Sequence, residues 1–322
     1  ALHNQTYGQV LAKRLRTLVW WTPKPKVVLE VGGGLGYVAR EMAKDFLPFE
    51  RQGTTYCFRD LTRPFLHSQL SLGGEAGWRA RGVQSNAEFL ALRDASVDLV
   101  IDNENLADMT PVNLTREEIQ TQTGTTPLHQ EALDWIRRVR LPLGSDIPEH
   151  VIFNLGPFRF LSELWRVMRP GGHAFLVEFG VDQGWPAPVK LPGHTEYEVQ
   201  YSHLRHAAKW LGFSEQYTTL PQFLGMRPDT QVLCTGAAYA IQRFCEAEGR
   251  SFPIRAYTEP ELASTLGDMQ PRVMGCHYHA VSDPAWFGLW DFKVLLLEKP
   301  GGVKRSAIRE RDGYRFYAEG GH

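Results

Sequence analysis

The chain has 322 residues, of which 43% are hydrophobic and 22% are charged, as in an ordinary soluble globular protein. Its formal net charge is −1, so no strong electrostatic field favours nucleic acid or anionic lipid as a partner. No apolar run reaches the roughly 18 residues that a membrane helix needs, and the N-terminus lacks the pattern of a signal peptide.

The four cysteines form no Cys-x-x-Cys pair, so we expect reduced thiols and, with them, a cytoplasmic location. The chain begins at Ala1 rather than Met, as expected of a domain taken from a longer polypeptide. A length of 322 residues suits a single α/β domain that carries large insertions.

Hydrophobic periodicity predicts alternating helices and strands in the first part of the chain. Apolar residues at helical spacing predict a helix from Gln9 to Trp20. The apolar run from Lys26 to Val31 predicts a buried strand, and a glycine-rich loop separates it from a helix predicted over Tyr37 to Phe46. A second strand is predicted from Thr54 to Phe58, and the next helix begins with Pro64 to Leu70.

The alternation continues further along the chain. Val97 to Ile101 and Ala174 to Phe179 are predicted strands. Between them, Phe158 to Met168 is a predicted amphipathic helix that stops at a Pro-Gly-Gly turn. A late strand is predicted within Asp291 to Glu298. Strands that alternate with helices predict an α/β fold with a largely parallel sheet.

Two long segments interrupt this alternation, and both follow predicted strands of the sheet. We expect one domain over residues 1–322, with its core at about 26–105, 151–180 and 252–300 and insertions at about 106–150 and 181–251. In an open α/β sheet, the loops after the carboxyl ends of the strands build the ligand crevice. The insertions are therefore expected to form a helical lid on the substrate side.

Gly32, Gly34 and Gly36 lie in the loop after the first predicted strand, and Glu30 precedes them. Glycines let the backbone turn sharply and approach a ligand closely. Dinucleotide sites use Gly-x-Gly-x-x-Gly in this place, whereas here the spacing is Gly-x-Gly-x-Gly and an acid comes first. Because a carboxylate repels a pyrophosphate but tolerates an ammonium or sulfonium group, the loop favours a cationic ligand. A tight turn without a ligand is the alternative.

Two polar residues between the second predicted strand and the strand at Val97 are further candidates for ligand contacts. Asp60 comes after the second predicted strand, where an acid can accept hydrogen bonds from both hydroxyls of a ribose. Asn86 precedes the strand that begins at Val97, and its carboxamide can hydrogen-bond an adenine edge. The alternatives are a helix cap for Asp60 and a turn residue for Asn86. The order of these elements is more specific than any one of them.

In this order, the motifs resemble those of class I S-adenosylmethionine-dependent methyltransferases. The resemblance is carried by Glu30 to Gly36, Asp60, Ser85 to Glu88, Ala95 to Val100 and Leu164 to Gly172. It implies a Rossmann-like α/β sheet of seven strands, the last one antiparallel, with S-adenosylmethionine over its carboxyl edge. The cofactor-binding residues that it implies are Glu30, Gly32, Gly34, Gly36, Asp60 and Asn86.

A closer similarity is to the MidA-like methyltransferases. It is carried by Tyr7-Gly8, Asp60 to Gln69, Asn103-Glu104, Glu178 to Gly180, His194 to Tyr197 and Tyr201 to Leu204. That family usually has Glu where Asp60 stands. The similarity adds Tyr7 and Asn103 to the expected cofactor-binding residues.

Relatives in this family act on different acceptors. Some methylate protein arginine. Others belong to polyketide assembly lines, methylate carbon on carrier-bound acyl groups and hold a single metal ion beside the cofactor. Residues 110–149 match no motif of the family, so the resemblance does not identify the substrate of this chain.

Methyl transfer to carbon or to a hydroxyl needs a base or a metal ion. The catalytic candidates are Glu104, Glu178 and His203, which lie at the carboxyl ends of predicted strands or in the segments that follow them. Gln200 and His203 are three residues apart and can share a helix face, so they are the predicted ligands of one mononuclear Fe or Mn ion. A carboxylate, Glu178 or Asp102, is expected to complete that site. The alternative is a structural His203, with Gln200 a capping or surface residue.

The sequence thus favours an enzyme that transfers methyl from S-adenosylmethionine to a carbon of a small or acyl-carrier-protein-bound substrate, with or without a metal ion. Two alternatives stay open. One is a protein arginine methyltransferase, for which Glu104, Glu178 and Glu196 would supply an acidic acceptor pocket. The other is a non-catalytic assembly factor that keeps the fold. Nucleic acid and membrane are not expected partners, and the sequence does not indicate the oligomeric state.

Overall fold

The computed structural model describes residues 2–3, 5–19, 24–272, 275–283 and 290–301. Seven strands of this part form the main sheet in the order β11-β14-β7-β4-β1-β2-β3, and the short strand β10 pairs with β7 beside them. Their bounds are β1 Lys26–Val31, β2 Thr54–Asp60, β3 Arg79–Gln84, β4 Val97–Asn103, β7 Met168–Val181, β10 Val199–Gln200, β11 Ser214–Thr219 and β14 Phe292–Glu298.

The sheet has the topology that the motifs imply. Strands β3, β2, β1, β4 and β7 are parallel neighbours, whereas β14 pairs antiparallel with both β7 and β11. The expected seven-stranded, Rossmann-like sheet with its last strand antiparallel is therefore confirmed. Because β1, β2, β4 and β7 run in the same direction, their carboxyl ends meet at one edge of the sheet.

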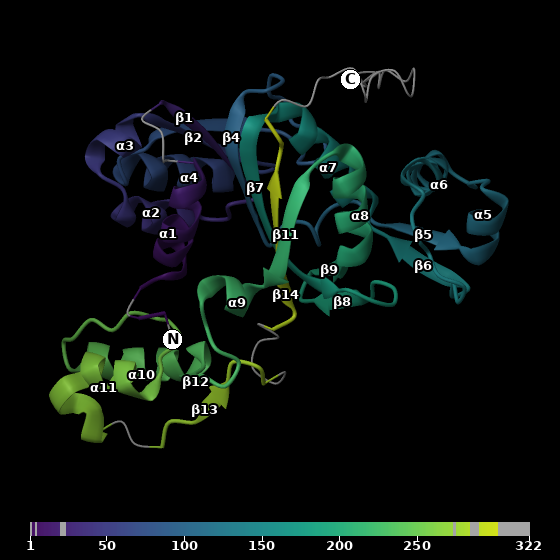
Figure 1. Ribbon diagram of the computed structural model, residues 1–322. Helices are drawn as coiled ribbons and strands as arrows, with labels where there is room; N and C mark the ends of the chain where they lie inside the picture. Colours follow the sequence, from purple (N-terminus) through teal and green to yellow (C-terminus); the bar gives the residue numbers. More distant parts are fainter. Residues whose placement is uncertain (1, 4, 20–23, 273–274, 284–289, 302–322) are drawn as a thin grey trace.

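Helices cover both faces of the sheet and bury two separate cores (Figure 1). One face is covered by α1 (Tyr7–Val19), α2 (Tyr37–Met42) and α4 (Arg63–Glu75), with η1 (Ala43–Asp45) and α3 (Pro48–Gln52) beside them. The other face is covered by α7 (Leu155–Val167) and α8 (Tyr201–Leu211). Successive residues of β1 serve the two cores in turn, Val28 on the first face and Leu29 on the second, as strand geometry requires.

Two strands of the sheet, β3 and β11, have no counterpart among the strands expected from the sequence. β3 has the sequence RARGVQ and is mostly exposed at one edge of the sheet. β11 has the sequence SEQYTT and lies at the other edge. An edge strand needs little apolar surface because one side faces solvent, so hydrophobic periodicity gives no signal for it.

The segment 106–150, expected to be an insertion, forms a small unit beside α7 and α8 (Figure 1). Strands β5 (Val112–Thr115) and β6 (His150–Phe153) pair antiparallel, and α5 (Arg116–Thr121) and α6 (Pro127–Val139) connect them. Its apolar side chains, including Leu133 and Ile136 of α6, belong to the same core as α7. This segment therefore extends the second core.

The segment 181–251 does not stay outside the sheet. It begins with the hairpin of β8 (Pro188–Leu191) and β9 (His194–Tyr197), but it then supplies α8 and β11, and β11 pairs with β14 throughout its length. The boundaries expected for this insertion need correction, because β11 belongs to the main sheet. Its polar sequence lacks the apolar pattern by which a strand is predicted.

The extra unit instead lies between β11 and β14. It contains α9 (Leu220–Leu224), β12 (Gln231–Leu233), α10 (Thr235–Ala247), α11 (Glu259–Leu266), η2 (Gly267–Arg272) and β13 (Tyr278–Ala280). Beyond α9, it has a hydrophobic cluster of its own that includes Leu233, Ile241, Phe252 and Leu262. Figure 1 shows it below α1, and the backbone amide of His3 donates to Glu261 Oε1 of α11 at 2.8 Å.

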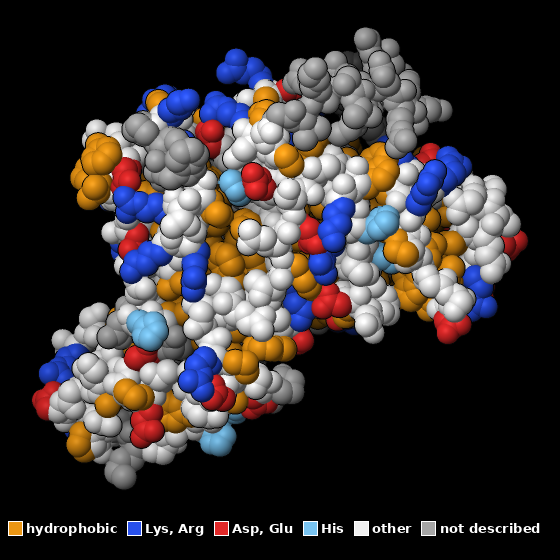
Figure 2. Space-filling view, in the orientation of Figure 1, with side chains coloured by type: hydrophobic (Ala, Val, Ile, Leu, Met, Phe, Trp, Pro, Cys, Tyr) orange, Lys and Arg blue, Asp and Glu red, His pale blue; other side chains and the backbone are white. Residues whose placement is uncertain are grey.

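The surface carries charges of both signs. On the face in Figure 2, Lys and Arg side chains are interspersed with Asp and Glu, and neither sign dominates, in keeping with the net charge of −1. Within the described residues, no helix combines the length and the apolar character needed to cross a membrane.

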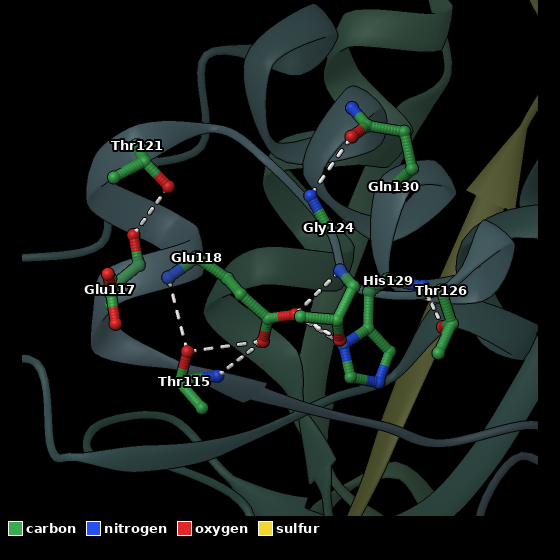
Figure 3. Close-up of polar contacts among 9 residues, drawn as sticks. Thr115, Glu117, Glu118, Thr121, Gly124, Thr126, His129 and Gln130 are labelled. Atoms are coloured by element: carbon green, nitrogen blue, oxygen red, sulfur yellow. Dashed lines mark hydrogen bonds and ion pairs between the residues drawn. The ribbon is translucent and has the colours of Figure 1, made fainter.

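A buried carboxylate, Glu118, holds the insertion of α5 and α6 together (Figure 3). It accepts hydrogen bonds from the backbone amides of Thr115 (2.9 Å) and Thr125 (3.0 Å), from both threonine hydroxyls, and from His129 Nδ1 at 2.6 Å. Burial alone would raise the pKa of Glu118, but these hydrogen bonds lower it well below its ordinary range. Glu118 thus joins the start of α5 to the segment that leads into α6 through hydrogen bonds.

Glu118→Gln is expected to reduce the free energy of unfolding by about 2 kcal/mol at neutral pH, because the charged acceptor is lost. Since folding lowers the pKa of Glu118, its contribution is complete above the ordinary glutamate pKa and disappears as the pH falls toward the folded value. Thermal unfolding measured from pH 7 to pH 3 tests both points. The exposed neighbour Glu117 provides the control Glu117→Gln. Equal stability of the two variants at neutral pH would contradict the role of Glu118.

Candidate functional site

The loop from Glu30 to Gly36 joins β1 to α2, and its glycines adopt backbone angles that other residues avoid. Gly32, Gly34 and Gly36 have φ of 63°, 52° and 88°. A Cβ on Gly32 would lie 2.6 Å from Asn105 Oδ1, and one on Gly36 would lie 2.9 Å from the Cα of Gln69. A Cβ on Gly34 would meet nothing within 4 Å. The loop is thus packed tightly from behind and open at Gly34.

Glu30 lies under this loop at the end of β1 and is 1% exposed. Its Oε2 accepts a hydrogen bond from the Tyr56 hydroxyl at 2.7 Å, while its buried Oε1 has no partner among the described residues. Burial raises the pKa of Glu30 to about 7, opposed by the hydrogen bond from Tyr56. An unpaired carboxylate oxygen in such a place favours a cationic ligand.

Asp60 ends β2 and is connected to the glycine loop through Gln69. Its Oδ1 accepts from the backbone amide of Thr62 at 2.9 Å, which fixes the turn before α4. Its Oδ2 accepts from Gln69 Nε2 at 2.8 Å, and the same amide group donates to the Gly34 carbonyl at 2.9 Å. The Thr62 hydroxyl also donates to Oδ1, at 3.3 Å, so Asp60 is held in position by the start of α4 and keeps a lone pair on Oδ2 for a further donor.

Asn86 lies in the loop after β3 and is exposed. Its Oδ1 accepts from the backbone amide of Glu88 at 2.9 Å, so it forms a turn, as the alternative to an adenine contact anticipated. Its amide nitrogen donates to none of the described residues. Leu61 and Phe89, which follow Asp60 and Asn86, are 62% and 58% exposed. The sequence analysis missed these two apolar side chains, although both come shortly after a predicted polar site residue.

Tyr7, Asn103 and Glu104 meet beside the end of β4. The Tyr7 hydroxyl, at the start of α1, donates to Asn103 Oδ1 at 2.5 Å, and Asn103 Nδ2 donates to Glu104 Oε1 at 3.1 Å. Glu104 has a φ of 57°, which is uncommon for a residue other than glycine. The structure therefore brings Tyr7 to the consecutive residues Asn103 and Glu104, which lie far from it in the sequence.

Two buried carboxyl groups lie deeper at the same edge. Glu178 on β7 is 2% exposed and accepts from the backbone amides of Ala107 (3.1 Å) and Phe179 (2.9 Å). Burial raises its pKa to about 8, and the negative charges of Asp102 and Glu104 add to that rise. Burial also raises the pKa of Asp102 to about 7; its Oδ2 accepts from Asn105, and its Oδ1 has no partner among the described residues.

Gln200 and His203, the predicted metal ligands, both contact the loop that follows β7. Gln200 Nε2 donates to the Gly184 carbonyl, and its buried Oε1 has no partner among the described residues. The ring of His203 lies 5.5 Å from that of Trp185 and is hydrogen-bonded to the Pro142 backbone. Burial lowers the pKa of His203 to about 4, so the imidazole is neutral at neutral pH, which a metal ligand requires. The ligand role of this pair stays a prediction.

A second set of donors was not anticipated as a unit. Asp108, His194 and Glu196 place one donor atom each within 4.8 Å of one another, in the loop after β4 and on β9. His194 Nε2 lies 2.9 Å from Glu196 Oε1, and the backbone amide of Tyr197 donates to the Ala107 carbonyl at 3.2 Å, which ties β9 to that loop. Burial is the largest cause of the raised pKa of Asp108 and of Glu104, and the negative charge of Glu196 raises both further.

Comparisons with known proteins support the fold. No family model and no curated protein matches this chain. An uncharacterized protein from Burkholderia thailandensis has a similar structure, with a TM-score of 0.56 and 16% identity over 91% of this chain and 78% of its own. At this identity, the likeness shows a shared fold.

Two further structures are less similar. The [4+2]-cyclase SpnF has a TM-score of 0.46 and 15% identity over 91% of this chain and 81% of its own. Phosphoethanolamine N-methyltransferase 2 from Haemonchus contortus has a TM-score of 0.45 and 15% identity over 91% of this chain. The aligned region covers 53% of that methyltransferase, so this chain spans about half its length.

Asp60→Ala is expected to weaken the binding of S-adenosylhomocysteine by about 1–3 kcal/mol, because two ribose hydroxyls lose a charged acceptor. Asp60→Asn keeps the shape of the side chain and should fall between the variant and the wild type. Calorimetry gives the affinities. Circular dichroism shows whether the variant is still folded, since Thr62 and Gln69 lose their hydrogen-bond acceptor in it. Unchanged affinity in a folded Asp60→Ala protein would show that the ribose is bound elsewhere.

Proposed function

We propose that this protein is an S-adenosylmethionine-dependent methyltransferase. The observation that carries the proposal is the buried, unpaired Oε1 of Glu30 beneath a glycine loop that is open at Gly34. A carboxylate there suits a ligand with a sulfonium and an ammonium group and disfavours the pyrophosphate of a dinucleotide. The fold adds support, because its class I methyltransferase topology brings this loop to the carboxyl edge of the sheet.

Each of the remaining predicted residues would contact a different part of the cofactor. Asp60 would accept from the ribose, and the free amide of Asn86 would donate to the adenine between the exposed side chains of Leu61 and Phe89. The hydrogen-bonded pair of Tyr7 and Asn103 would close the methionine end. Hydrogen bonding inside the protein already holds most of these groups in place, which reduces the ordering that binding requires.

For the acceptor, we favour a carbon of a small or carrier-bound acyl group, as in some MidA-like relatives. In that reaction the acceptor carbon forms a bond to the methyl carbon, the sulfur–methyl bond breaks with both electrons passing to sulfur, and a base removes the acceptor proton. Glu178 suits the base: with its pKa raised to about 8 only a minor fraction is ionised at neutral pH, but that fraction is a stronger proton acceptor than an ordinary carboxylate. Glu104 lies close enough to influence it electrostatically.

The wild-type protein is expected to bind S-adenosylmethionine with micromolar affinity and to show no binding of NAD. Calorimetry with both ligands tests this step. Transfer of radiolabelled methyl is then measured to a malonyl or acetoacetyl group on an acyl carrier protein and, in parallel, to an arginine-rich peptide. Binding of NAD without S-adenosylmethionine would remove the methyltransferase assignment, and methylation of the peptide alone would replace the acyl acceptor with arginine.

A specific observation keeps arginine as the second candidate acceptor. The negative charge of Glu196 acts on both Glu104 and Asp108, and Glu104 acts in turn on the buried Glu178. Such a cluster suits a guanidinium, which carboxylates bind through paired hydrogen bonds. A non-catalytic assembly factor is the third possibility, and cofactor binding without transfer to either acceptor would favour it.

Two of these acids, together with His194, could also bind the proposed metal ion. Two carboxylates and one imidazole, from Asp108, Glu196 and His194, form a donor set that suits Mn or Fe. Gln200 and His203 form the alternative set expected from the sequence. A bound ion would polarise the carbonyl of an acyl acceptor and make its neighbouring carbon more acidic.

Elemental analysis of protein purified without chelator is expected to find about one Mn or Fe per chain. Glu196→Gln and His203→Ala separate the two donor sets, since each removes a ligand of one set only. Loss of metal in Glu196→Gln alone would assign the ion to Asp108, His194 and Glu196, and loss in His203→Ala alone would assign it to Gln200 and His203. A metal-free wild type whose methyl transfer survives a strong chelator would rule out metal assistance.

A further inference from the structure

Arg59 is fully buried in β2, directly before Asp60, and is the largest side chain in the described core with almost no exposure. Neighbouring residues of a strand point to opposite faces, so Arg59 lies on the face away from Asp60, where Cys57 belongs to the second core. A buried guanidinium is costly unless charges and acceptors surround it. Its neighbours therefore indicate what it does.

The guanidinium binds one residue of the loop after β3 twice. Its Nη2 donates to the Ser85 carbonyl, and its Nε donates to the Ser85 hydroxyl at 3.2 Å. The backbone amide of Ser85 in turn donates to the Asp60 carbonyl at 3.2 Å. Ser85 is thus fixed from both sides at the point where the chain leaves β3 and turns toward Asn86.

Three carboxylates from different elements surround this single charge. Asp60 ends β2, Asp102 is the penultimate residue of β4 and Glu88 lies in the loop that Arg59 holds, and all three stabilise the protonated guanidinium. Burial lowers the pKa of Arg59 to about 10, so it stays charged at neutral pH. Glu88 is itself held by Thr110 and Arg159. Arg59 therefore connects the ribose acid, the loop after β3 and the end of β4.

We propose that Arg59 is a positioning residue that sets the adenosine half of the site, by holding the loop of Ser85 and Asn86 against Asp60. This inference rests on the proposed cofactor site. Because Asn86 donates to none of the described residues through its side-chain nitrogen, its direction depends on the backbone that carries it. The contact between Arg59 and Ser85 supplies the rigid attachment of that backbone to β2.

A double-mutant cycle between Arg59 and Asn86 tests the inference. Arg59→Met is expected to weaken the binding of S-adenosylhomocysteine at least ~10-fold, since the loop loses its attachment. Asn86→Ala alone should weaken binding by roughly fivefold, but by less than about twofold when Arg59→Met is already present. In the Arg59→Met protein a displaced Asn86 contributes little to binding, so its removal has little further effect. Arg59→Lys keeps the charge without the two-point contact, so its affinity should lie between wild type and Arg59→Met.

Arg166 provides the matched control, because its guanidinium also binds two backbone carbonyls of the connection between β3 and β4, those of Leu90 and Leu92, which lie further along that connection than Asn86. Arg166→Met should lower the melting temperature while leaving the effect of Asn86→Ala unchanged. If Arg59→Met does not fold, the same cycle is measured with Arg59→Lys.

The outcomes separate the two proposals. A wild type that does not bind S-adenosylhomocysteine overturns the proposed function and this inference with it. A wild type that binds, with additive effects of the Arg59 and Asn86 substitutions, overturns the positioning role alone. Non-additive effects for Arg59, together with additive effects for Arg166, establish it.

Discussion

A carboxylate that is removed from water needs hydrogen bonds, an opposite charge or a proton, and four of them lie at the carboxyl edge of this sheet: Glu30, Asp60, Asp102 and Glu178. Each meets the requirement differently. Asp60 is hydrogen-bonded by the turn and by Gln69, Asp102 lies near Arg59, Glu178 accepts two backbone amides, and Glu30 keeps one oxygen unpaired. The hydrogen bonds to these carboxylates form only when the strands, the turn after β2 and α4 keep their positions. The same positions fix the geometry of the candidate site.

The same constraint explains why part of the site was predictable. Parallel strands bring their carboxyl ends to one edge, so a polar residue at each strand end can be placed there from the sequence alone. Glu30, Asp60 and Glu178 were located in this way, and the glycine loop was recognised because its spacing reports unusual backbone angles. Predictions of this kind need only the strand positions, which the apolar runs of β1, β4 and β7 reveal.

What escaped prediction depends on pairing across the fold. The polar strand β11 has no apolar pattern, and it was placed in an insertion although it completes the sheet beside β14. Arg59 was not singled out, since nothing in the sequence shows that its guanidinium meets Ser85. Asp108, His194 and Glu196 are brought together by a contact between β9 and the loop after β4. Such contacts join segments far apart in the chain, and local patterns do not encode them.

The chemistry of the acceptor depends on how these acids share protons. With a pKa of about 8, Glu178 is largely protonated at neutral pH, so this buried side chain is mostly uncharged and is compatible with an uncharged acyl group beside it. Glu104, Asp108 and Glu196 are more exposed, and the negative charge of Glu196 acts on the other two. A cation bound by these exposed acids would offset their charge and leave the neutral Glu178 available to an acyl group. The difference in charge between the exposed acids and the buried Glu178 is therefore the physical reason why our proposal favours an acyl acceptor assisted by a cation over an arginine side chain.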